Sequence, residues 1–408
     1  MGFKVAFVST FPPQKEGIAS YSLSLVKALV SHSGIRVIVL ACTSYNEEDC
    51  LNISAMKVWR RNSVKYPFSI SKGIAKLKSG LVHIQYEYLL YGSPFYSGLF
   101  PLLLLILKLM GKKVIVTMHS VVLKSSLNDE FFRRYNAGGS LATLKKIFVI
   151  GLTEFIAYLS DKIIVHQEIA KSELSNQYGI NSLKIHVIPH GIESYGQVLD
   201  SGVAKKKLGM QGRIVFYFGF LRPDRGIEYA IDAMKIVVEK HPDVKLVIAG
   251  GAHLFSFYDG EDYFNKLRTL AKELGLSENV IFINRYIPEQ ELPLYFSSAD
   301  LFVLPYTEKG IIGASGVMSK ILRFGKPLIF TRIYRFIDLW KLDGMPIAEP
   351  EDSGSLANAI LQILGSPSLR ERVGKELREL AIEESWDFVA DKTLSLYRET
   401  LNGNEASH

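Results

Sequence analysis

The sequence predicts an α/β protein with two doubly wound domains, each a parallel sheet between layers of helices. Its 408 residues are enough for two domains of the usual ~100–200 residues. Apolar residues make up 48% of the chain, so large buried cores are expected. Short apolar runs alternate with longer helical patterns from end to end, which is typical of βαβ units.

The first half of the chain begins with an apolar run that predicts a core strand and lacks the pattern of a signal peptide. Its longest apolar stretch, 99–110, would form a helix far shorter than a ~30 Å hydrocarbon core, so we expect a buried or surface-lying helix. The expected strands are 3–9, 36–41, 81–85, 114–119, 162–166 and 185–188, with helices at 18–30 and 96–110.

A polar, glycine-rich stretch at 191–212 interrupts this rhythm and predicts a linker. The rhythm then restarts, which places one domain at 1–195, a second at 205–382 and a final helix at 383–408. We expect the two domains to be similar in size and to face a cleft. In the second, the expected strands are 213–218, 244–248, 280–284, 301–304 and 327–330, with a helix at 226–240.

Charge and cysteine content narrow the class of partner. The net charge of +7 favours diphosphates or anionic membrane surfaces, and the lack of any zinc-finger or RNA-binding signature disfavours nucleic acid. Cys42 and Cys50 are not in a metal-binding spacing and indicate a reducing compartment.

No Asp-x-Asp triplet occurs, so no metal is expected. Glu261 and Asp262 instead compensate the positive end of a helix.

The segment 123–144 contains two adjacent phenylalanines and basic residues that continue to position 146. We interpret it as a mobile loop leading into a basic helix. It is either a solvated connection, or a lid or membrane-surface patch, since basic side chains beside apolar ones suit an anionic interface.

Two turns after predicted strands are candidate anion sites. Gly17 starts the first helix, where backbone N–H groups are open to a phosphate, although the G-x-G-x-x-G fingerprint is absent. In the second domain a strand leads into Gly219, and Arg222 and Arg225 occupy the turn before the next helix. Two guanidiniums at the carboxyl edge of such a sheet can hold a diphosphate and stabilise its departure.

A glycine-rich loop follows the strand that ends at Pro305. One carboxylate in it is suited to sugar hydroxyls, and one serine is placed to cap the next helix and leave N–H groups for an anion. We expect this loop and the arginine turn to meet around a single pyrophosphate, across a gap from His119. The loop residues concerned are Glu308, Gly310, Gly313, Ser315 and Gly316.

Polar residues also stand at strand ends of the first domain. His119 ends a strand, and its neutral imidazole can hydrogen-bond a transferring sugar. Glu87 follows another strand and can orient or deprotonate an acceptor hydroxyl. We expect His83 to be a core residue, while His166 and His190 are supported by their positions alone.

The ordered set of motifs resembles the retaining glycosyltransferase family 4, whose architecture is called GT-B. The resemblance covers nearly the whole chain, through EGIASYSLSLVKAL, HIQYEYLLYG, VIVTMHSVV, VIPHGIE, FGFLRPDRGIEYAI, ASGVMSKILRFGKPLI and ESWDFVADKTLSLY. It implies two Rossmann-like domains facing a cleft: an N-terminal acceptor-side domain and a C-terminal domain that binds the nucleotide-sugar donor. It also implies that the last helix crosses back onto the first domain.

The resemblance implies a reaction and its partners. A cytoplasmic, metal-independent enzyme without a cofactor would move a hexose-type sugar from a nucleotide diphosphate sugar, such as a GDP- or UDP-sugar, to a hydroxyl acceptor. Anomeric configuration would be retained, and the acceptor would be a glycan or a lipid-linked glycan. In addition, the apolar helix at 96–110 and the basic residues up to position 146 lead us to expect peripheral contact of the protein with the inner membrane face.

Applied position by position, the resemblance also implies roles for individual residues. The catalytic residues would be His119, on the transferred sugar, with Arg225 and its basic partner Arg222 on the diphosphate. The acceptor side would include Glu87 and Tyr21. The donor site would comprise Gly17, Gly219, Arg222, Arg225, Arg285, Tyr286, Ile287, Glu308, Gly313, Ser315, Gly316 and Val317.

Two departures from the family pattern keep alternatives open. Many members carry two glutamates where this chain has Ile312 and Lys320, and Phe220 replaces an arginine after the glycine of the basic turn. The alternatives are a GT-B protein that binds a nucleotide sugar without transfer, a nucleotide-sugar epimerase or a phosphorylase. A NAD-dependent oxidoreductase is disfavoured by the missing glycine fingerprint.

Overall fold

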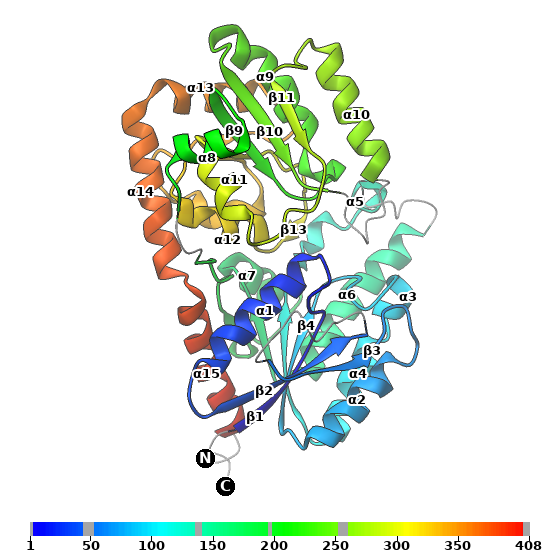
Figure 1. The fold of residues 1–408 in the computed structure, drawn as a ribbon. Coiled ribbons are helices and arrows are strands. Elements are labelled where there is room, and N and C mark those ends of the chain that lie inside the picture. The colour runs from blue at the N-terminus through cyan, green and yellow to red at the C-terminus, as the bar shows by residue number, and fades with distance from the viewer. Residues whose placement is uncertain (1–2, 44–52, 135–140, 195–197, 252–259, 403–408) are drawn as a thin grey trace. The chain divides into compact units, whose positions relative to one another are not determined.

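The chain divides into two compact units, each built around its own sheet (Figure 1). The computed structural model describes residues 3–43, 53–134, 141–194, 198–251 and 260–402, so Cys50 lies outside the described residues. The first unit contains Met1–Gly191, Gly310–Gly316 and Glu384–His408, and the second contains Ile192–Lys309 and Val317–Glu383.

Seven parallel strands form the sheet of the first unit, in the order β3-β2-β1-β4-β5-β7-β8. The expected strands of this half are confirmed to within a residue or two, whereas the sequence reasoning missed β3. The strands are β1 (Phe3–Ser9), β2 (Ile35–Cys42), β3 (Ala55–Trp59), β4 (Leu81–Tyr86), β5 (Lys113–Met118), β7 (Lys162–Val165) and β8 (Ile185–Val187).

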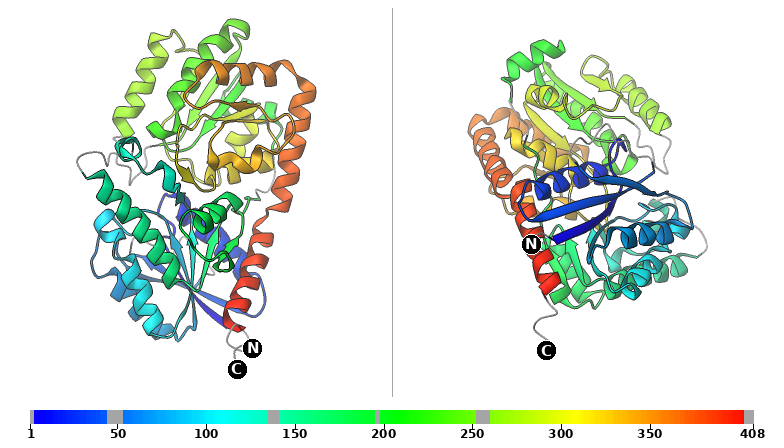
Figure 2. Two further views of the ribbon diagram at one scale, coloured as in Figure 1. Left: turned by 180° about the vertical axis from the view of Figure 1, so that it is seen from behind. Right: turned by 60° about the horizontal axis from the view of Figure 1, so that its bottom comes forward.

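Helices cover both faces of this sheet, and alternate residues of β1 show which helices share a face. Val5 and Phe7 pack in one apolar cluster with α1 and α15, while Ala6 and Val8 pack in another with α2, α4 and α6. Figure 2 shows these helices from two further sides. The helices are α1 (Gly17–Val30), α2 (Tyr66–Leu77), α3 (Pro94–Ser97), α4 (Phe100–Leu109), α5 (Asp129–Arg134), α6 (Ala142–Leu159), α7 (Glu168–Asn176) and α15 (Trp386–Asn402).

The C-terminal helix α15 belongs to the first unit although the second unit precedes it in the chain. Leu394 and Tyr397 are buried in the cluster that contains Val26 and Leu29 of α1. The Tyr397 hydroxyl also lies 2.6 Å from Nδ1 of His83, which is fully buried as predicted. The first sheet therefore depends on a helix from the far end of the chain.

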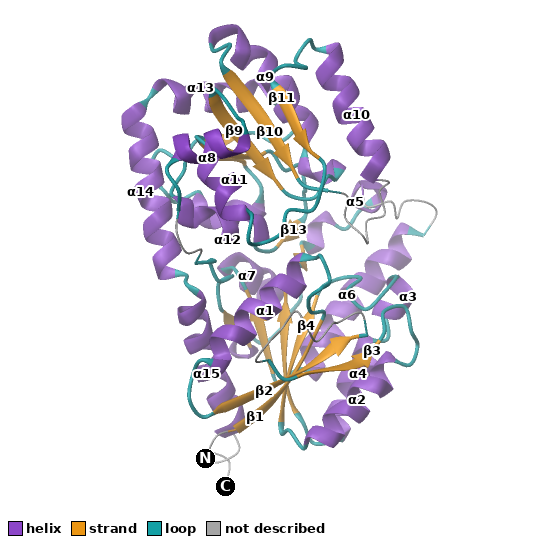
Figure 3. Ribbon diagram, viewed as in Figure 1, coloured by secondary structure: helices purple, strands orange, loops and turns teal. Residues whose placement is uncertain are grey.

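Six parallel strands form the sheet of the second unit, in the order β11-β10-β9-β12-β14-β15. Helices again alternate with strands along the chain, as Figure 3 shows by colour. The strands are β9 (Arg213–Phe218), β10 (Val244–Ala249), β11 (Val280–Ile283), β12 (Leu301–Leu304), β14 (Leu328–Thr331) and β15 (Ile347–Ala348). The helices are α8 (Ser201–Leu208), α9 (Ile227–Lys240), α10 (Gly260–Glu273), α11 (Leu292–Ser298), α12 (Gly316–Ile321), α13 (Ser353–Gly365) and α14 (Pro367–Glu383).

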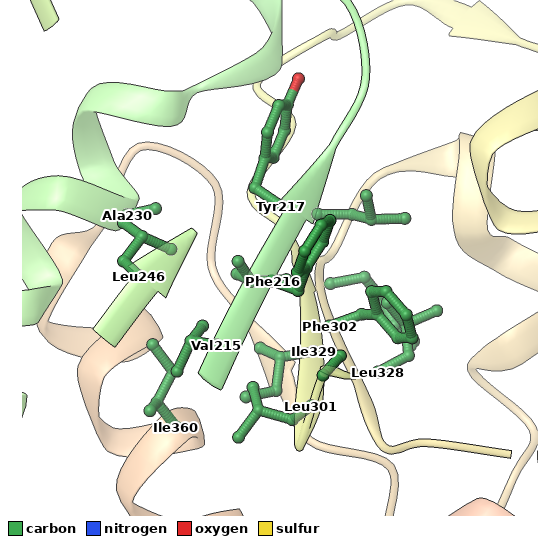
Figure 4. Packing of buried hydrophobic residues seen from close by; sticks show 14 of the residues in the cluster. Val215, Phe216, Tyr217, Ala230, Leu246, Leu301, Phe302, Leu328, Ile329 and Ile360 are labelled. Carbon is green, nitrogen blue, oxygen red and sulfur yellow. The ribbon is translucent and has the colours of Figure 1, made fainter. Parts of the chain in front are cut away.

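Side chains on the two faces of β9 hold the second core together. Figure 4 shows Val215 beside Ile360 of α13, and Phe216 on the opposite face with Phe302. The Phe216 ring meets that of Phe302 edge-on at 6.0 Å and that of Phe296 at 6.1 Å. This period-two alternation with apolar residues on both faces is what a parallel strand buried on both sides requires.

The linker predicted at 191–212 is in part wrong, because α8 forms within it. The Asp200 carboxylate accepts from the backbone N–H of Val203, and Gly209 ends the helix in the left-handed conformation at φ 66°. Three lysines in the last turn suit the negative end of the helix dipole. The polar composition of the segment reflects an exposed helix rather than an irregular connection.

The domain predicted at 205–382 also needs one correction. The loop segment Gly310–Gly316 belongs to the first unit, because β13 (Ile311–Ile312) pairs antiparallel with β6 (Val121–Val122) of that unit. Ile312 is fully buried in the first core, so an apolar side chain is favoured at this position. Among the described residues, no helix is both long enough and apolar enough to cross a membrane.

Replacing Ile312 by glutamate should destabilise the first unit strongly. The change Ile312→Glu puts a carboxylate where the side chain is fully buried, and we expect a loss of about 3 kcal/mol or more in the free energy of unfolding. Ile312→Met, which keeps the volume and apolar character, should cost less than ~1.5 kcal/mol. Urea unfolding of both variants measures this, and equal stability would contradict the buried placement of β13.

Candidate functional site

The arginine turn of the second unit is shaped by a glycine. β9 leads through Gly219 to a short 3₁₀ turn, Pro223–Arg225, and then to Gly226, which starts α9 at φ 61°. A Cβ on Gly226 would lie 2.1 Å from the carbonyl oxygen of Pro305, so both its backbone angle and its surroundings require glycine. The backbone N–H of Thr307 donates to the backbone carbonyl of Asp224 at 3.1 Å, which ties the turn to the loop after β12.

Asp224 binds the first of the two predicted arginines. Arg222 donates to it from Nε at 2.9 Å and from Nη2 at 2.8 Å, which is the bidentate arrangement that planar guanidinium and carboxylate groups favour. Burial alone would raise the pKa of Asp224, but Arg225 and Arg222 outweigh it, so the pKa is lowered. The carboxylate is therefore ionised and holds Arg222 in place.

Arg225 is the more deeply placed arginine. Its guanidinium lies over the ring of Tyr306 at 4.3 Å, with nitrogens 3.8 Å from Asp224 and 4.0 Å from Glu308. Burial would lower the pKa of Arg225, but the neighbouring Asp224, Tyr306 and Glu308 raise it, so the charge is kept. Within the described residues, its buried Nη1 has no hydrogen-bond partner.

Arg335 is a site residue that the sequence reasoning missed. From the 3₁₀ segment Tyr334–Leu339, it donates through Nε to the buried Glu308 carboxylate at 2.6 Å and pairs with it through Nη2. The sequence assigned Glu308 to sugar hydroxyls, but the structure shows the carboxylate between two arginines. The sequence offered one hint of the Glu308–Arg335 pair, because Arg335 follows closely after the core strand predicted at 327–330.

The cluster of Arg222, Arg225, Arg335, Asp224 and Glu308, called here the arginine cradle, has a net positive charge. Three guanidiniums face two carboxylates, and the residues that the structure describes provide no acceptor for the buried Nη1 of Arg225. Burying an unsatisfied charged donor is costly, so an anionic oxygen that fills this position would be strongly favoured. The cradle is suited to phosphate-type anions.

Other predicted donor residues of the second unit lie at the same edge of its sheet. Arg285 follows β11 and donates to Glu291 at 2.5 Å and to the Tyr295 hydroxyl at 3.0 Å, so its charge is already paired. Tyr286 is 40% exposed and Ile287 is buried.

Gly219 and Val317 are neighbours, because a Cβ on Gly219 would lie 3.5 Å from Val317 Cγ2. Lys320 forms an ion pair with Glu289.

The remaining loop residues lie in the first unit, which corrects their assignment to the second domain. A Cβ on Gly313 would be 2.5 Å from the carbonyl oxygen of His119, so this glycine allows the loop to touch the end of β5. Ser315 is buried, and Gly316 starts the six-residue helix α12 near His190. Their convergence with Arg222 and Arg225 stays a prediction.

Aromatic rings gather around Tyr21 in the first unit. The buried Tyr21 ring lies 4.7 Å from His119, 5.3 Å from His166, 5.0 Å from His190 and 5.2 Å from Trp386. Trp386 comes from α15, so the C-terminal helix completes this cluster, which we call the histidine cluster. The sequence reasoning placed Tyr21 on the acceptor side but gave His166 only a weak argument.

Hydrogen bonds join these histidines in a buried row. His119 Nε2 lies 2.9 Å from Gln85 Oε1, and its Nδ1 lies 3.2 Å from His166 Nε2. His166 donates through Nδ1 to the carbonyl of Ile188, and Gln85 continues the row to His83 at 3.0 Å. Both ring nitrogens of His119 therefore face polar atoms of the protein, and because a neutral imidazole carries one N–H, His119 donates to only one of the two. The role of Gln85 could have been suspected from the sequence, because polar and apolar residues alternate in the buried strand HIQY.

The histidines of this row are neutral. Burial lowers the pKa of His83 to about 3 and that of His166 to about 4. Burial and then the neighbouring His166, His190 and His83 lower the pKa of His119 well below its usual value. His83, His119 and His166 thus form an uncharged row, in contrast to the charged arginine cradle.

Two further predicted residues stand at the carboxyl edge of the first sheet. Glu87 follows β4 and accepts from Ser120 Oγ at 2.6 Å, which fixes its carboxylate beside the end of β5. Gly17 starts α1, and a Cβ there would meet open space. Its neighbour Glu16, which the sequence reasoning missed, has a pKa raised by burial, which Thr10 and Arg61 partly offset. Among the described residues, no cluster of three or more potential metal ligands is found.

The neutral histidines should make the first unit sensitive to acid. Their folded pKa values lie below the unfolded value of 6.5, so their contribution to stability is complete above pH 6.5 and is lost as pH falls toward 4. Each should cost about 2 kcal/mol between pH 7.5 and pH 5. Urea unfolding at the two pH values measures the loss, and His166→Gln should reduce it. A pH dependence unchanged by His166→Gln would contradict the neutral assignment.

Comparison with known proteins gives one family for both halves of the chain. The model described as "Glycosyltransferase Family 4" matches residues 16–194, and that described as "Glycosyl transferases group 1" matches residues 202–380. Mannosylfructose-phosphate synthase from Agrobacterium fabrum is 26% identical over 258 residues, which cover 60% of this chain and 54% of that protein. The chain thus matches little more than half the length of this curated relative.

Solved structures agree over the full length. Sucrose-phosphate synthase from Thermosynechococcus elongatus has a TM-score of 0.74 at 20% identity, covering 98% of this chain and 100% of that one. Anabaena HepE in complex with UDP-glucose has a TM-score of 0.70 at 16% identity, covering 96% and 99%. These likenesses establish the GT-B fold. With both family models matched in order, the chain belongs to the family 4, group 1 glycosyltransferases.

Proposed function

We propose that this protein is a retaining, metal-independent glycosyltransferase that moves a hexose-type sugar from a nucleotide diphosphate sugar to a hydroxyl acceptor. The observation that carries the proposal is the buried Nη1 of Arg225, which lacks a hydrogen-bond partner among the described residues, in a net-positive cradle. A diphosphate oxygen supplies both the acceptor and the negative charge that this position favours.

The arginine cradle would act mainly on the leaving group. Negative charge grows on the diphosphate as its bond to the sugar breaks, and a guanidinium already held in position stabilises that charge without rearrangement. Asp224 and Glu308 keep Arg222, Arg225 and Arg335 aligned. The backbone at Ser315 and Gly316 would provide further N–H groups to the same diphosphate.

The histidine cluster would serve the sugar and the acceptor. A neutral His119 avoids repulsion with the positive charge that develops on the sugar ring, and its row of partners holds it rigidly. Glu87, fixed by Ser120, would orient the acceptor hydroxyl. Tyr21, whose ring packs against that of His119, would help to hold the imidazole in place.

The family relatives support the choice of donor class. Mannosylfructose-phosphate synthase is named for joining sugars, and HepE was solved with UDP-glucose. We propose a UDP- or GDP-sugar as donor, no cofactor, and a glycan or lipid-linked glycan as acceptor. Cys42 is buried and forms no disulfide within the part of the chain that the structure describes. We propose the cytoplasm as the compartment.

Arg225→Ala should lower turnover by at least ~100-fold, because it removes the main charge-stabilising donor. Arg225→Lys, which keeps the positive charge but not the planar fork of donors, should recover part of the loss. Arg332→Ala, at an exposed ion pair with Glu349 in the same unit, is the matched control and should stay near wild type. The measurement is steady-state release of nucleoside diphosphate, and an Arg225→Ala turnover near that of wild type refutes the role of the cradle.

The donor should be identifiable by thermal shift. Ligands that bind only the folded state stabilise it by mass action, so the true nucleoside diphosphate and its sugar should raise the melting temperature most among a panel. Transfer assays with that donor then separate the alternatives. Binding without transfer to any acceptor would favour a non-catalytic protein, and turnover without an acceptor would favour an epimerase or a phosphorylase.

A further inference from the structure

The outer surface of α6 presents a continuous apolar stripe. Its members recur at helical spacing, so they lie on one side of the helix, away from the buried Leu152, Thr153 and Ile156. Large side chains that could have packed inside are instead 42–80% exposed. They are Leu144, Ile147, Phe148, Phe155 and Tyr158, preceded by Leu141 at 63%.

Two neighbouring helices extend this stripe into a surface. α4 packs against α6, and α2 packs against α4, so the three form one row. Phe148 of α6 lies against the chain before α4, because a Cβ on Gly98 would be 3.2 Å from its ring. The exposed apolar residues added by this row are Phe68 on α2, Phe95 on α3, and Leu102, Leu105 and Leu109 on α4.

Most charged residues on α2, α4 and α6 are lysines. α2, α4 and α6 carry the lysines 72, 76, 108, 145 and 146, and the only acidic residue in their sequences is Glu154. That carboxylate is 3.7 Å from Lys124, and Lys108 pairs with Asp161 at 2.7 Å. The surface therefore combines exposed apolar side chains with exposed cations such as Lys72 and Lys146, and its one carboxylate, Glu154, lies near Lys124.

We propose that this face of α2, α4 and α6, the apolar–basic face, binds an anionic lipid bilayer. Phenylalanine, tyrosine and leucine side chains beside lysines match the chemistry of the headgroup boundary, where rings and aliphatic chains insert and ammonium groups meet lipid phosphates. A second copy of the chain fits poorly, because a symmetric interface would bring the same lysines together. An apolar surface this extensive marks an interaction site rather than ordinary surface.

This inference stands apart from the proposed chemistry. It uses no residue of the arginine cradle or the histidine cluster, and it holds whether or not sugar transfer occurs. If both proposals hold, the first unit would sit on the membrane surface, where an acceptor carried by a lipid is concentrated.

Vesicle co-sedimentation tests the inference directly. The probes are vesicles of phosphatidylcholine alone and vesicles that also contain phosphatidylglycerol. We expect the full chain to bind the anionic vesicles at least ~10-fold more strongly than the neutral ones, since each lysine near the surface contributes about fivefold. Absence of binding to anionic vesicles, or equal binding to both, overturns the proposal.

Matched variants locate the surface. Ile147→Glu with Phe155→Glu should reduce binding to anionic vesicles by ~10-fold or more. Val203→Glu with Ile382→Glu adds the same charge at exposed apolar positions of the second unit and should leave binding unchanged. Equal losses in the two double variants would overturn the assignment to this face.

A second pair of measurements keeps the test independent of folding and of activity. Lys72→Ala with Lys146→Ala removes only exposed charge, and it should weaken anionic binding ~10-fold or more while leaving the melting temperature and the response to nucleoside diphosphates unchanged. Analytical ultracentrifugation of wild type and Ile147→Glu/Phe155→Glu should show the same mass. A dimer that the glutamates dissociate would overturn the bilayer in favour of a second copy.

Discussion

The burial of the Arg225 guanidinium is the constraint on which the candidate site depends. A charge removed from water needs compensating partners, and breaking such a set by removing one partner typically costs 3–5 kcal/mol. The second unit meets this need with two carboxylates and the face of Tyr306, drawn from the ends of β9 and β12. Gly226 is required because the turn must pass within contact of Pro305.

The candidate site residues of the two units differ in charge. The arginine cradle keeps its charges by pairing them, while the histidine cluster excludes charge through burial, which lowers the pKa of each histidine in the row. Positive charge suits a departing diphosphate, and a neutral wall suits a sugar that passes through a cationic state. Tyr21, at the centre of the rings, connects the histidines with α15.

The apolar residues of the first unit differ in how far they are buried. β1 is buried on both faces, so its residues alternate between two cores, whereas α6 is buried on one side only. The apolar side chains on its other side cannot lower the free energy of folding through the core, because no described element packs over them. Their placement beside lysines agrees with the association with a bilayer that we propose.

The sequence by itself determined the class of the fold, most of the strands and the candidate residues at strand ends. These features depend on local patterns: β1 and β12 could be located because apolar runs of strand length stand between turn signals. It also determined the arginine pair, since both residues lie within one turn. It misread α8 as a linker, because an exposed helix has the polar composition of a loop.

Only the tertiary structure decided what these residues contact. The Glu308–Arg335 pair, the Gln85–His119–His166 row and the pairing of β13 with β6 join segments far apart in the chain, so no local spacing could reveal them. The same holds for the loop 310–316, which the sequence assigned to the second domain and the strand pairing assigns to the first unit. Long-range pairing is set by competition among all segments for the same core, so patterns within short stretches of sequence do not reveal it.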